Sequence, residues 1–317
     1  MRDKGKDFIS AVIYVHDAED RIGSLLRVVM MTLGNDFVYA EIICVDDGSS
    51  DGSVERIRET AREAEGICVS ILHLSHYHGM ETAMSAGMDL AIGDFVFEFD
   101  QSFLDYDSMQ ILEAYQKALE GYDIVRASPD TREALTSRLF YKLFERFSDI
   151  PYTLHTESFR ILSRRAVNRI NSMNKMVLYR KAAYADCGLK TASIRYPPNG
   201  AEGRERRMAG SSRAERRYRR QLALDALILL TEVGYRFSVT MTMSMMGLTL
   251  FMAVYSVVVY LFQDPVEGWT TTVLFLSVAF FGLFGMLIII IRYLQILVRL
   301  ESKHKRYSFE SIEKLNG

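Results

Sequence analysis

Two adjacent carboxylates, Asp46 and Asp47, stand in the segment EIICVDDGSSDGS, residues 41–53. An apolar run precedes them, as in a buried strand, and Gly and Ser follow them, as in a turn that leads into a helix. Carboxylates at the end of a strand can accept hydrogen bonds from a nucleobase or from ribose hydroxyls. We therefore expect Asp46 and Asp47 to contact a nucleotide, and Asp51 to serve mainly the turn. The alternative, that all three only shape the turn and cap the helix, stays open.

The elements that position these carboxylates alternate between strands and helices. Short apolar runs rich in β-branched residues indicate buried strands, and apolar residues at helical spacing fall between them. The expected elements are strands at residues 8–15, 40–45, 68–74 and 95–99, and helices at residues 19–33, 53–64 and 79–92. A helix at residues 109–119, a strand at 122–125 and a helix at 132–147 are expected to follow, in a less regular pattern. This alternation predicts an α/β fold with a mostly parallel sheet and helices on both faces. Ligands of such sheets bind at the carboxyl ends of the strands.

Two later segments contain no charged residue. Residues 238–262 and 270–291 lack Asp, Glu, Lys and Arg, and each is long enough to cross a hydrocarbon core, which needs about 20 apolar residues. Basic residues gather before the first segment and after the second, whereas the connecting residues 263–269 contain no Lys or Arg. The positive-inside rule then predicts a multi-pass protein with both termini in the cytoplasm. The alternative, two core helices of a soluble protein, stays open.

The average composition does not show that the chain contains both an α/β part and two uncharged apolar segments. The chain has 317 residues, of which 49% are hydrophobic and 25% charged, and its formal net charge is -2. We expect an α/β domain at residues 1–200, a basic loop with an amphipathic interfacial helix at 201–236, a transmembrane hairpin at 237–300 and a cytoplasmic tail at 301–317. No signal peptide is expected. The three cysteines lack metal-ligand spacing and are expected to be buried, reduced thiols.

Several motifs, in their order along the chain, resemble those of family 2 glycosyltransferases. They are DDGSSDG after the second strand, the helix HGMETAMSAG that begins at His78, and Gly93-Asp94 before the fourth strand. Two further segments, residues 136–148 (TSRLFYKLFERFS) and Arg207 to Arg213, are similar to the polyprenyl-phosphate branch, which includes bactoprenol glucosyltransferases and dolichol-phosphate mannose synthases. The resemblance covers nearly the whole chain and implies a GT-A fold, which is Rossmann-like.

The resemblance also implies an activity. A family member of this branch is an inverting glycosyltransferase of the inner (cytoplasmic) membrane that moves a sugar from a nucleotide diphosphate sugar to a polyprenyl phosphate such as undecaprenyl phosphate. Its partners are these two substrates and the membrane; a homo-oligomer is left open, and no nucleic acid is expected. The residues matched to donor binding are Val15, Asp17, Asp46, Asp47, Gly79, Asp100 and Gln101. The residues matched to phosphate binding and catalysis are Arg132, Arg160, Arg207, Ser212 and Arg213.

The resemblance further implies that the protein binds a divalent cation. The family binds Mg²⁺ or Mn²⁺ through an Asp-x-Asp motif, because the cation neutralises the diphosphate leaving group. The matching residues here are Asp100, Gln101 and Ser102, so the second carboxylate is missing. The expected metal site therefore consists of Asp100 and the Ser102 position, completed by Asp105, by Asp107 or by a water. Glu98 is a less favoured candidate, because it should point to the opposite face of the strand.

Three other departures concern residues outside this motif. Met80 stands where the family has a lysine, and Ser158 stands where an acid precedes Phe-Arg. An arginine expected near Pro129 is absent, which leaves Arg126 and Arg132 as stand-ins. Such losses are also typical of non-catalytic relatives. The alternative function is therefore a nucleotide-sugar-binding or scaffolding subunit in glycan assembly.

Overall fold

The computed structural model describes residues 4–64, 66–130, 157–173, 180–197, 233–262, 268–301 and 307–315. The chain divides into two compact units. The first holds the described residues up to 197 together with the C-terminal segment 307–315, and the second holds residues 233–301. Each unit is described by itself.

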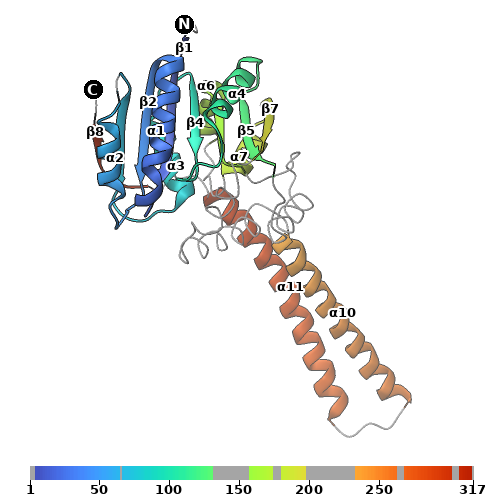
Figure 1. The fold of residues 1–317 in the computed structure, drawn as a ribbon. Helices are drawn as coiled ribbons and strands as arrows, with labels where there is room; N and C mark the ends of the chain where they lie inside the picture. Colours follow the sequence, from blue (N-terminus) through green and yellow to red (C-terminus); the bar gives the residue numbers. More distant parts are fainter. Residues whose placement is uncertain are drawn as a thin grey trace. The chain divides into compact units, whose positions relative to one another are not determined.

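The first unit is built on an eight-stranded sheet with the order β7-β5-β6-β4-β1-β2-β3-β8 (Figure 1). The strands are β1 (Gly5–Val15), β2 (Phe37–Asp46), β3 (Cys68–Leu74), β4 (Phe95–Phe99), β5 (Ile124–Pro129), β6 (Phe159–Ser163), β7 (Thr191–Tyr196) and β8 (Phe309–Lys314). β1 pairs in parallel with β2 and β4, β2 with β3, and β5 with β7. Only β6 and β8 pair antiparallel to their neighbours. The mostly parallel sheet is as expected.

Helices cover both faces of this sheet, which confirms the expected fold class. The helices are α1 (Glu19–Asp36), α2 (Ser53–Ala61), α3 (Met80–Leu90), α4 (Ser108–Leu119), α6 (Arg164–Ser172) and α7 (Arg180–Asp186). Successive side chains of a strand point to opposite faces. Ile13 of β1 accordingly packs in a core with α1, α2 and α4, whereas Val12 packs in a core with α3, α6 and α7.

Helix α3 approaches the sheet closely at Gly87. A Cβ atom at this position would lie 2.5 Å from Val12 Cγ1 and 2.6 Å from Val45 Cγ2. The glycine therefore allows α3 to pack directly over β1 and β2, near the ends of the strands that carry the aspartates.

The strand order reverses at β1, which lies between β2 and β4. Val15 at the end of β1 is aligned with Asp46 at the end of β2. The carboxyl ends of these parallel strands meet at one edge of the sheet, which is where open α/β sheets bind ligands.

The C-terminal residues contribute a strand that the sequence did not predict. Residues 301–317 were expected only as a tail, yet β8 pairs with β3, from Ser70 opposite Lys314 to Leu74 opposite Phe309. FESIEK mixes two apolar residues with charged ones and follows a long apolar helix. This pattern is typical of an edge strand with one exposed face, but it is too short to distinguish from a loop.

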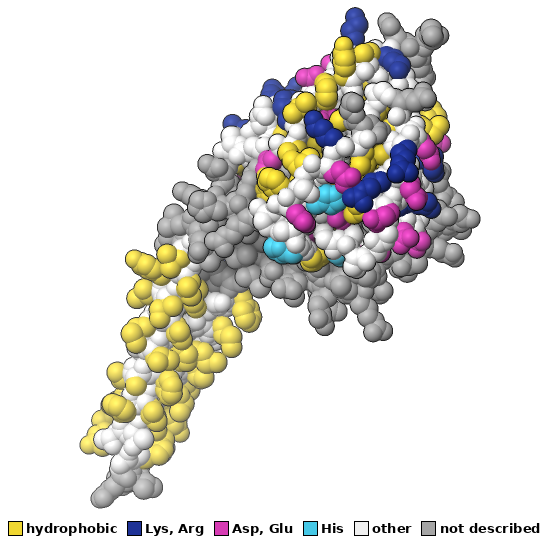
Figure 2. Space-filling model, turned by 90° about the vertical axis from the view of Figure 1, so that its left-hand side faces the viewer, with side chains coloured by type: hydrophobic (Ala, Val, Ile, Leu, Met, Phe, Trp, Pro, Cys, Tyr) yellow, Lys and Arg dark blue, Asp and Glu magenta, His cyan; other side chains and the backbone are white. Residues whose placement is uncertain are grey.

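The second unit is a pair of consecutive helices, α10 (Val233–Phe262) and α11 (Trp269–Glu301), which run antiparallel (Figure 1). Both are long and apolar enough to cross a membrane, and only 6% of the most apolar window of each is buried. Apolar side chains cover their visible surface in Figure 2. Because a core helix of a soluble protein would be buried, this exposure favours a membrane hairpin. The expected interfacial helix lies almost wholly outside the described residues.

Candidate active site

Asp47 lies directly after β2 and is fully buried. Its carboxylate accepts hydrogen bonds from the backbone N–H groups of His78 (2.7 Å) and Gly79 (2.8 Å), which precede α3, and from the Tyr14 hydroxyl (3.2 Å). Burial raises the pKa of Asp47, although these hydrogen bonds act in the opposite direction. Gly79 has a φ of 87°, which glycine adopts without strain. Asp47 thus organises the turn that begins α3.

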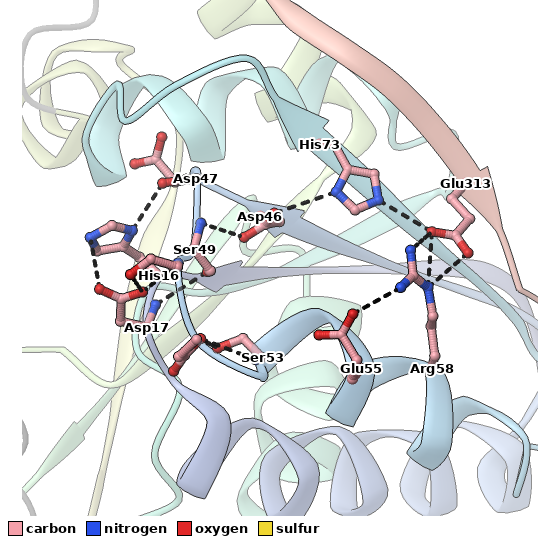
Figure 3. Close-up of polar contacts among 12 residues, drawn as sticks. His16, Asp17, Asp46, Asp47, Ser49, Ser53, Glu55, Arg58, His73 and Glu313 are labelled. Atoms are coloured by element: carbon pink, nitrogen blue, oxygen red, sulfur yellow. Dashed lines mark hydrogen bonds and ion pairs between the residues drawn. The ribbon is translucent and has the colours of Figure 1, made fainter.

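Asp46 ends β2 and is also nearly buried. Its Oδ1 atom accepts a hydrogen bond from the Ser49 N–H at 3.0 Å, and its Oδ2 atom lies 3.4 Å from His73 Nδ1 (Figure 3). Burial alone would raise the pKa of Asp46, but the contacts with His73 and Ser49 outweigh it and lower that pKa. Asp46 therefore offers an ionised carboxylate at the end of the strand.

The loop after β1 is joined to the same turn. Asp17 has a φ of 44°, and its Oδ1 accepts hydrogen bonds from the Ser50 N–H (2.8 Å) and hydroxyl (3.2 Å). The Asp17 N–H donates to Ser49 Oγ at 3.2 Å, and the carbonyl of Val15 accepts from the Asp47 N–H at 2.9 Å. The Asp17 side chain is 45% exposed. These contacts bring the expected donor-binding residues of β1 and β2 together at one edge of the sheet.

Asp100, at the end of β4, lies between two buried arginines. Arg160 of β6 contacts its Oδ2 atom through Nη2, and Arg180 of α7 donates from Nη2 to its Oδ1 atom at 2.5 Å. Burial raises the pKa of Asp100, but the two guanidinium charges outweigh it and hold that pKa well below its usual range. Both oxygens of this carboxylate are thus bound by the protein itself.

The two arginines bind further carboxylates. Arg160 donates to Glu98 at 2.7 Å and to Glu157 at 3.0 Å. Arg180 donates to Glu81 at 2.9 Å and to Glu98 at 2.9 Å. We call Arg160, Arg180, Glu81, Glu98, Asp100 and Glu157 the ion-pair cluster; it joins α3, β4, β6 and α7. Buried charges are stable only when paired, so this cluster is a structural unit.

The sequence did not predict most of the contacts in this cluster. Glu98 carried a signal, because a charge inside the apolar strand FVFEF must find a buried partner. Arg160 lies opposite Glu98 in the β4–β6 pairing, so that partner is a cross-strand neighbour. Arg180 begins a short helix and carries no signal that we recognise in the sequence.

The other expected metal ligands form hydrogen bonds with groups of the protein itself. The Ser102 hydroxyl donates to the Tyr14 carbonyl at 3.0 Å. Asp105 accepts hydrogen bonds from the Tyr196 hydroxyl (3.1 Å) and the Ser158 hydroxyl (3.3 Å). Asp107 caps α4 by accepting from the Met109 N–H.

These contacts test whether the residues fit a divalent cation. Among the residues that the structure describes, no group of three His, Cys, Asp or Glu side chains is placed to hold a metal ion. A cation at Asp100 would also lie beside two guanidinium groups and be repelled by them. The residues as arranged do not fit Mg²⁺ or Mn²⁺, and the ligand set Asp100, Ser102 and Asp105 stays a prediction.

Only one of the five expected phosphate-binding residues lies among the residues that the structure describes. Arg160 is described, but it is almost wholly buried and bound to three carboxylates. The other four, Arg132, Arg207, Ser212 and Arg213, lie outside the described residues. Gln101 is partly exposed beside Asp100.

Comparison with known proteins identifies the family. The model of glycosyl transferase family 2 matches residues 10–188. An uncharacterized glycosyltransferase from Synechocystis is 31% identical over 192 residues, which are 59% of this chain and 59% of that protein. An undecaprenyl-phosphate 4-deoxy-4-formamido-L-arabinose transferase from Klebsiella pneumoniae is 35% identical over 128 residues, or 39% of this chain and 38% of that protein. The match thus spans less than two thirds of each of these relatives.

A solved structure with a related fold is glucosyl-3-phosphoglycerate synthase from Mycobacterium tuberculosis. It is 14% identical, with a TM-score of 0.46, and the match covers 70% of this chain and 79% of that chain. The family model spans more than half of the sequence and includes both strand ends that carry Asp46 and Asp100. The chain therefore belongs to glycosyl transferase family 2.

Proposed function

We propose that this protein transfers a sugar from a nucleotide diphosphate sugar to a polyprenyl phosphate at the cytoplasmic face of the inner membrane. The observation that carries the proposal is the carboxylate-bearing turn at the switch point of the sheet, in a chain that also has two exposed apolar helices. The name of the Klebsiella relative states an undecaprenyl-phosphate acceptor for that protein.

Asp46 and Asp17 are the proposed contacts to the donor nucleoside. Asp46 is ionised and can only accept hydrogen bonds, so it suits a nucleobase N–H or a ribose hydroxyl. Asp17 has its Oδ1 atom bound to Ser50, while its side chain remains 45% exposed at the same edge. Asp47, which is fully buried and accepts three hydrogen bonds from the chain itself, is proposed to support these residues by holding the turn.

The reaction makes one bond and breaks one. An oxygen of the lipid phosphate forms a bond with the anomeric carbon, while the bond from that carbon to the diphosphate breaks and its electron pair leaves with the nucleoside diphosphate. A lipid phosphate is already anionic near neutral pH, so no general base is needed to create the nucleophile. Attack opposite the leaving group inverts the anomeric carbon.

Positive charge is needed to hold two phosphate-bearing substrates together. We propose Arg132, Arg207 and Arg213 for this role, with Ser212 as a hydrogen-bond donor. Arg160 is proposed as a positioning residue instead, because its guanidinium is bound to Glu98, Asp100 and Glu157. A divalent cation would supply further charge to the leaving group, but no step is assigned to it because Asp100 does not fit one.

The connectivity of the chain supports the membrane placement. The chain leaves the first unit before α10 and returns to it after α11, where β8 joins the sheet. Two crossings return a chain to the side from which it started. We therefore propose a hairpin whose two ends lie on the same side of the membrane as the sheet. The basic residues that flank the hairpin assign this side to the cytoplasm. Assembly into a homo-oligomer stays a prediction.

The release of nucleoside diphosphate tests this proposal. The full-length protein in detergent is incubated with UDP- and GDP-sugars, with and without undecaprenyl phosphate. We expect one donor to release UDP or GDP only when the lipid phosphate is present. Asp46→Asn is expected to weaken donor binding, whereas Glu59→Gln, an exposed change on α2, is expected to leave it unchanged. Nucleotide binding without release for any donor would favour the non-catalytic alternative.

A further inference from the structure

The C-terminal segment, residues 307–315, runs along the edge of the sheet beside the aspartate turn. β8 pairs antiparallel with β3, and the Leu315 N–H extends this pairing by donating to the Val69 carbonyl at 2.9 Å. The strand follows the second apolar helix, α11, which ends at Glu301. In the sequence, five residues separate the end of α11 from this segment.

A line of charged contacts leads from this strand to Asp46 (Figure 3). Glu313 Oε2 lies 3.3 Å from His73 Nε2, and His73 Nδ1 lies 3.4 Å from Asp46 Oδ2. Arg58 of α2 holds Glu313 in place with Nη2 at 2.8 Å from Oε2. His73 thus lies between two carboxylates, one on β2 and one on β8.

This placement determines the state of the imidazole. A neutral histidine has one N–H donor, whereas a ring with an acceptor at each nitrogen must be protonated to satisfy both. The contact with Asp46 raises the pKa of His73, and Glu313 adds to that rise. A protonated ring between two fixed carboxylates has a single favourable orientation, and so does the Asp46 side chain that it contacts.

The beginning of the segment contacts the second aspartate through the loop before α3. The Ser308 hydroxyl lies 2.6 Å from the Ser75 hydroxyl, and the Ser308 N–H donates to His78 Nε2 at 3.3 Å. His78 is the residue whose backbone N–H binds Asp47. The Tyr307 hydroxyl donates to Asp89 of α3 at 2.9 Å. Both aspartates of the turn are therefore linked to residues 307–313.

We propose that the C-terminal segment is part of the donor-nucleotide site, and that Glu313 is a positioning residue which acts through His73 to orient the Asp46 carboxylate for nucleotide binding. This inference rests on the proposed function, because it takes Asp46 as a contact to the nucleotide. Glu313 does not touch the nucleotide. It keeps the imidazole charged and correctly turned, so that Asp46 need not be ordered when the nucleotide binds.

Nucleotide titration of the full-length protein in detergent tests this inference, with UDP and GDP as the probes. Glu313→Gln keeps the shape of the side chain but removes its charge, and we expect the dissociation constant of the bound nucleotide to rise about tenfold, as for loss of one charge-assisted contact. Glu310→Gln is the matched control, because Glu310 is an exposed residue of the same strand. We expect it to bind like the wild type.

Two further measurements separate positioning from simple stability. If Glu313 acts through His73, the double variant with His73→Gln should bind no more weakly than His73→Gln alone. Wild-type binding should also weaken as the pH rises through the pKa of His73, and Glu313→Gln should move this loss to lower pH. A thermal melt of each variant checks that the chain is folded.

Failure of the positioning role and failure of the proposed function would give different results. Wild-type affinity and an unchanged pH profile in Glu313→Gln would overturn the positioning role while the nucleotide site stands. Additive losses in the double variant would overturn the route through His73. If the wild type binds neither nucleotide, the proposed function fails, and the inference fails with it.

Discussion

The paired carboxylates at the end of β2 have unequal roles in the structure. The sequence predicts that Asp46 and Asp47 lie at the end of a buried strand, and it treats them alike. Asp47 is enclosed by the N–H groups that begin α3, whereas Asp46 is oriented by His73. Neither partner could be inferred from local pattern, because His73 and Gly79 are brought near by strand pairing and helix packing.

The contact between His73 and Asp46 predicts a pH-dependent stability. Folding raises the pKa of His73 from 6.5, so its contribution is fully present below about pH 6.5 and is lost as the pH rises through the higher folded value. Folding lowers the pKa of Asp46 from 3.8, so its contribution is present above about pH 3.8 and is lost as the pH falls through the lower folded value. Both contributions are complete between these two values.

Thermal melts of the wild type and His73→Gln from pH 4 to pH 9 measure this dependence. We expect the largest difference in melting temperature at about pH 4 to 6.5, and a decline at higher pH. His76→Gln, which changes an exposed histidine, serves as the control. A difference that grows steadily toward pH 9 would contradict a charged His73 in the folded protein.

At the scale of elements, the alternation of strands and helices up to β4 was predictable, because each strand is a short apolar run and each helix has a clear apolar face. The ion-pair cluster was not, since it joins α3, β4, β6 and α7 across the sheet. Asp100 was expected as a metal ligand because it matches the first aspartate of the family's Asp-x-Asp motif. In the structure, Arg160 and Arg180 contact its two oxygens, and neither of these contacts was expected.

The cluster predicts a large loss of stability when Asp100 is neutralised. Asp100→Asn removes one of the two carboxylates that both buried guanidinium groups share, the other being Glu98, and this loss is expected to cost about 3–5 kcal/mol. A clear fall in melting temperature should follow. Asp20→Asn, an exposed change on α1, should have little effect.

Adding a divalent cation to the same melts tests whether Asp100 binds a metal. A ligand that binds the folded state raises its stability by mass action. We expect Mg²⁺ and Mn²⁺ to stabilise the wild type no more than Asp100→Asn. Stabilisation of the wild type that is lost in Asp100→Asn would show that Asp100 binds a metal.

At the scale of the whole molecule, the two apolar helices were predictable from length and from the absence of charge. The return of the chain to the sheet after them was not, because β8 is short and mixed in character. Because of this return, the first unit contains residues from both before and after the two helices. The proposed hairpin places two membrane crossings between these two parts of the first unit.

Cysteine labelling in intact spheroplasts tests this arrangement. A membrane-impermeant maleimide is expected to label Glu267→Cys, in the connection between the two helices, from outside. Lys6→Cys, an exposed position before the core of β1, should be labelled only after lysis. The opposite pattern, or equal labelling of both positions in intact cells, would contradict a hairpin with the sheet in the cytoplasm.

Mass spectrometry of the lipid product shows whether the protein transfers a sugar to a lipid phosphate. The full-length protein is incubated with undecaprenyl phosphate and the nucleotide sugar that supports release of nucleoside diphosphate. We expect a new lipid whose mass is that of undecaprenyl phosphate plus one sugar residue, formed by the wild type and much reduced in Asp46→Asn. Full consumption of the donor with free sugar as the only product would contradict it.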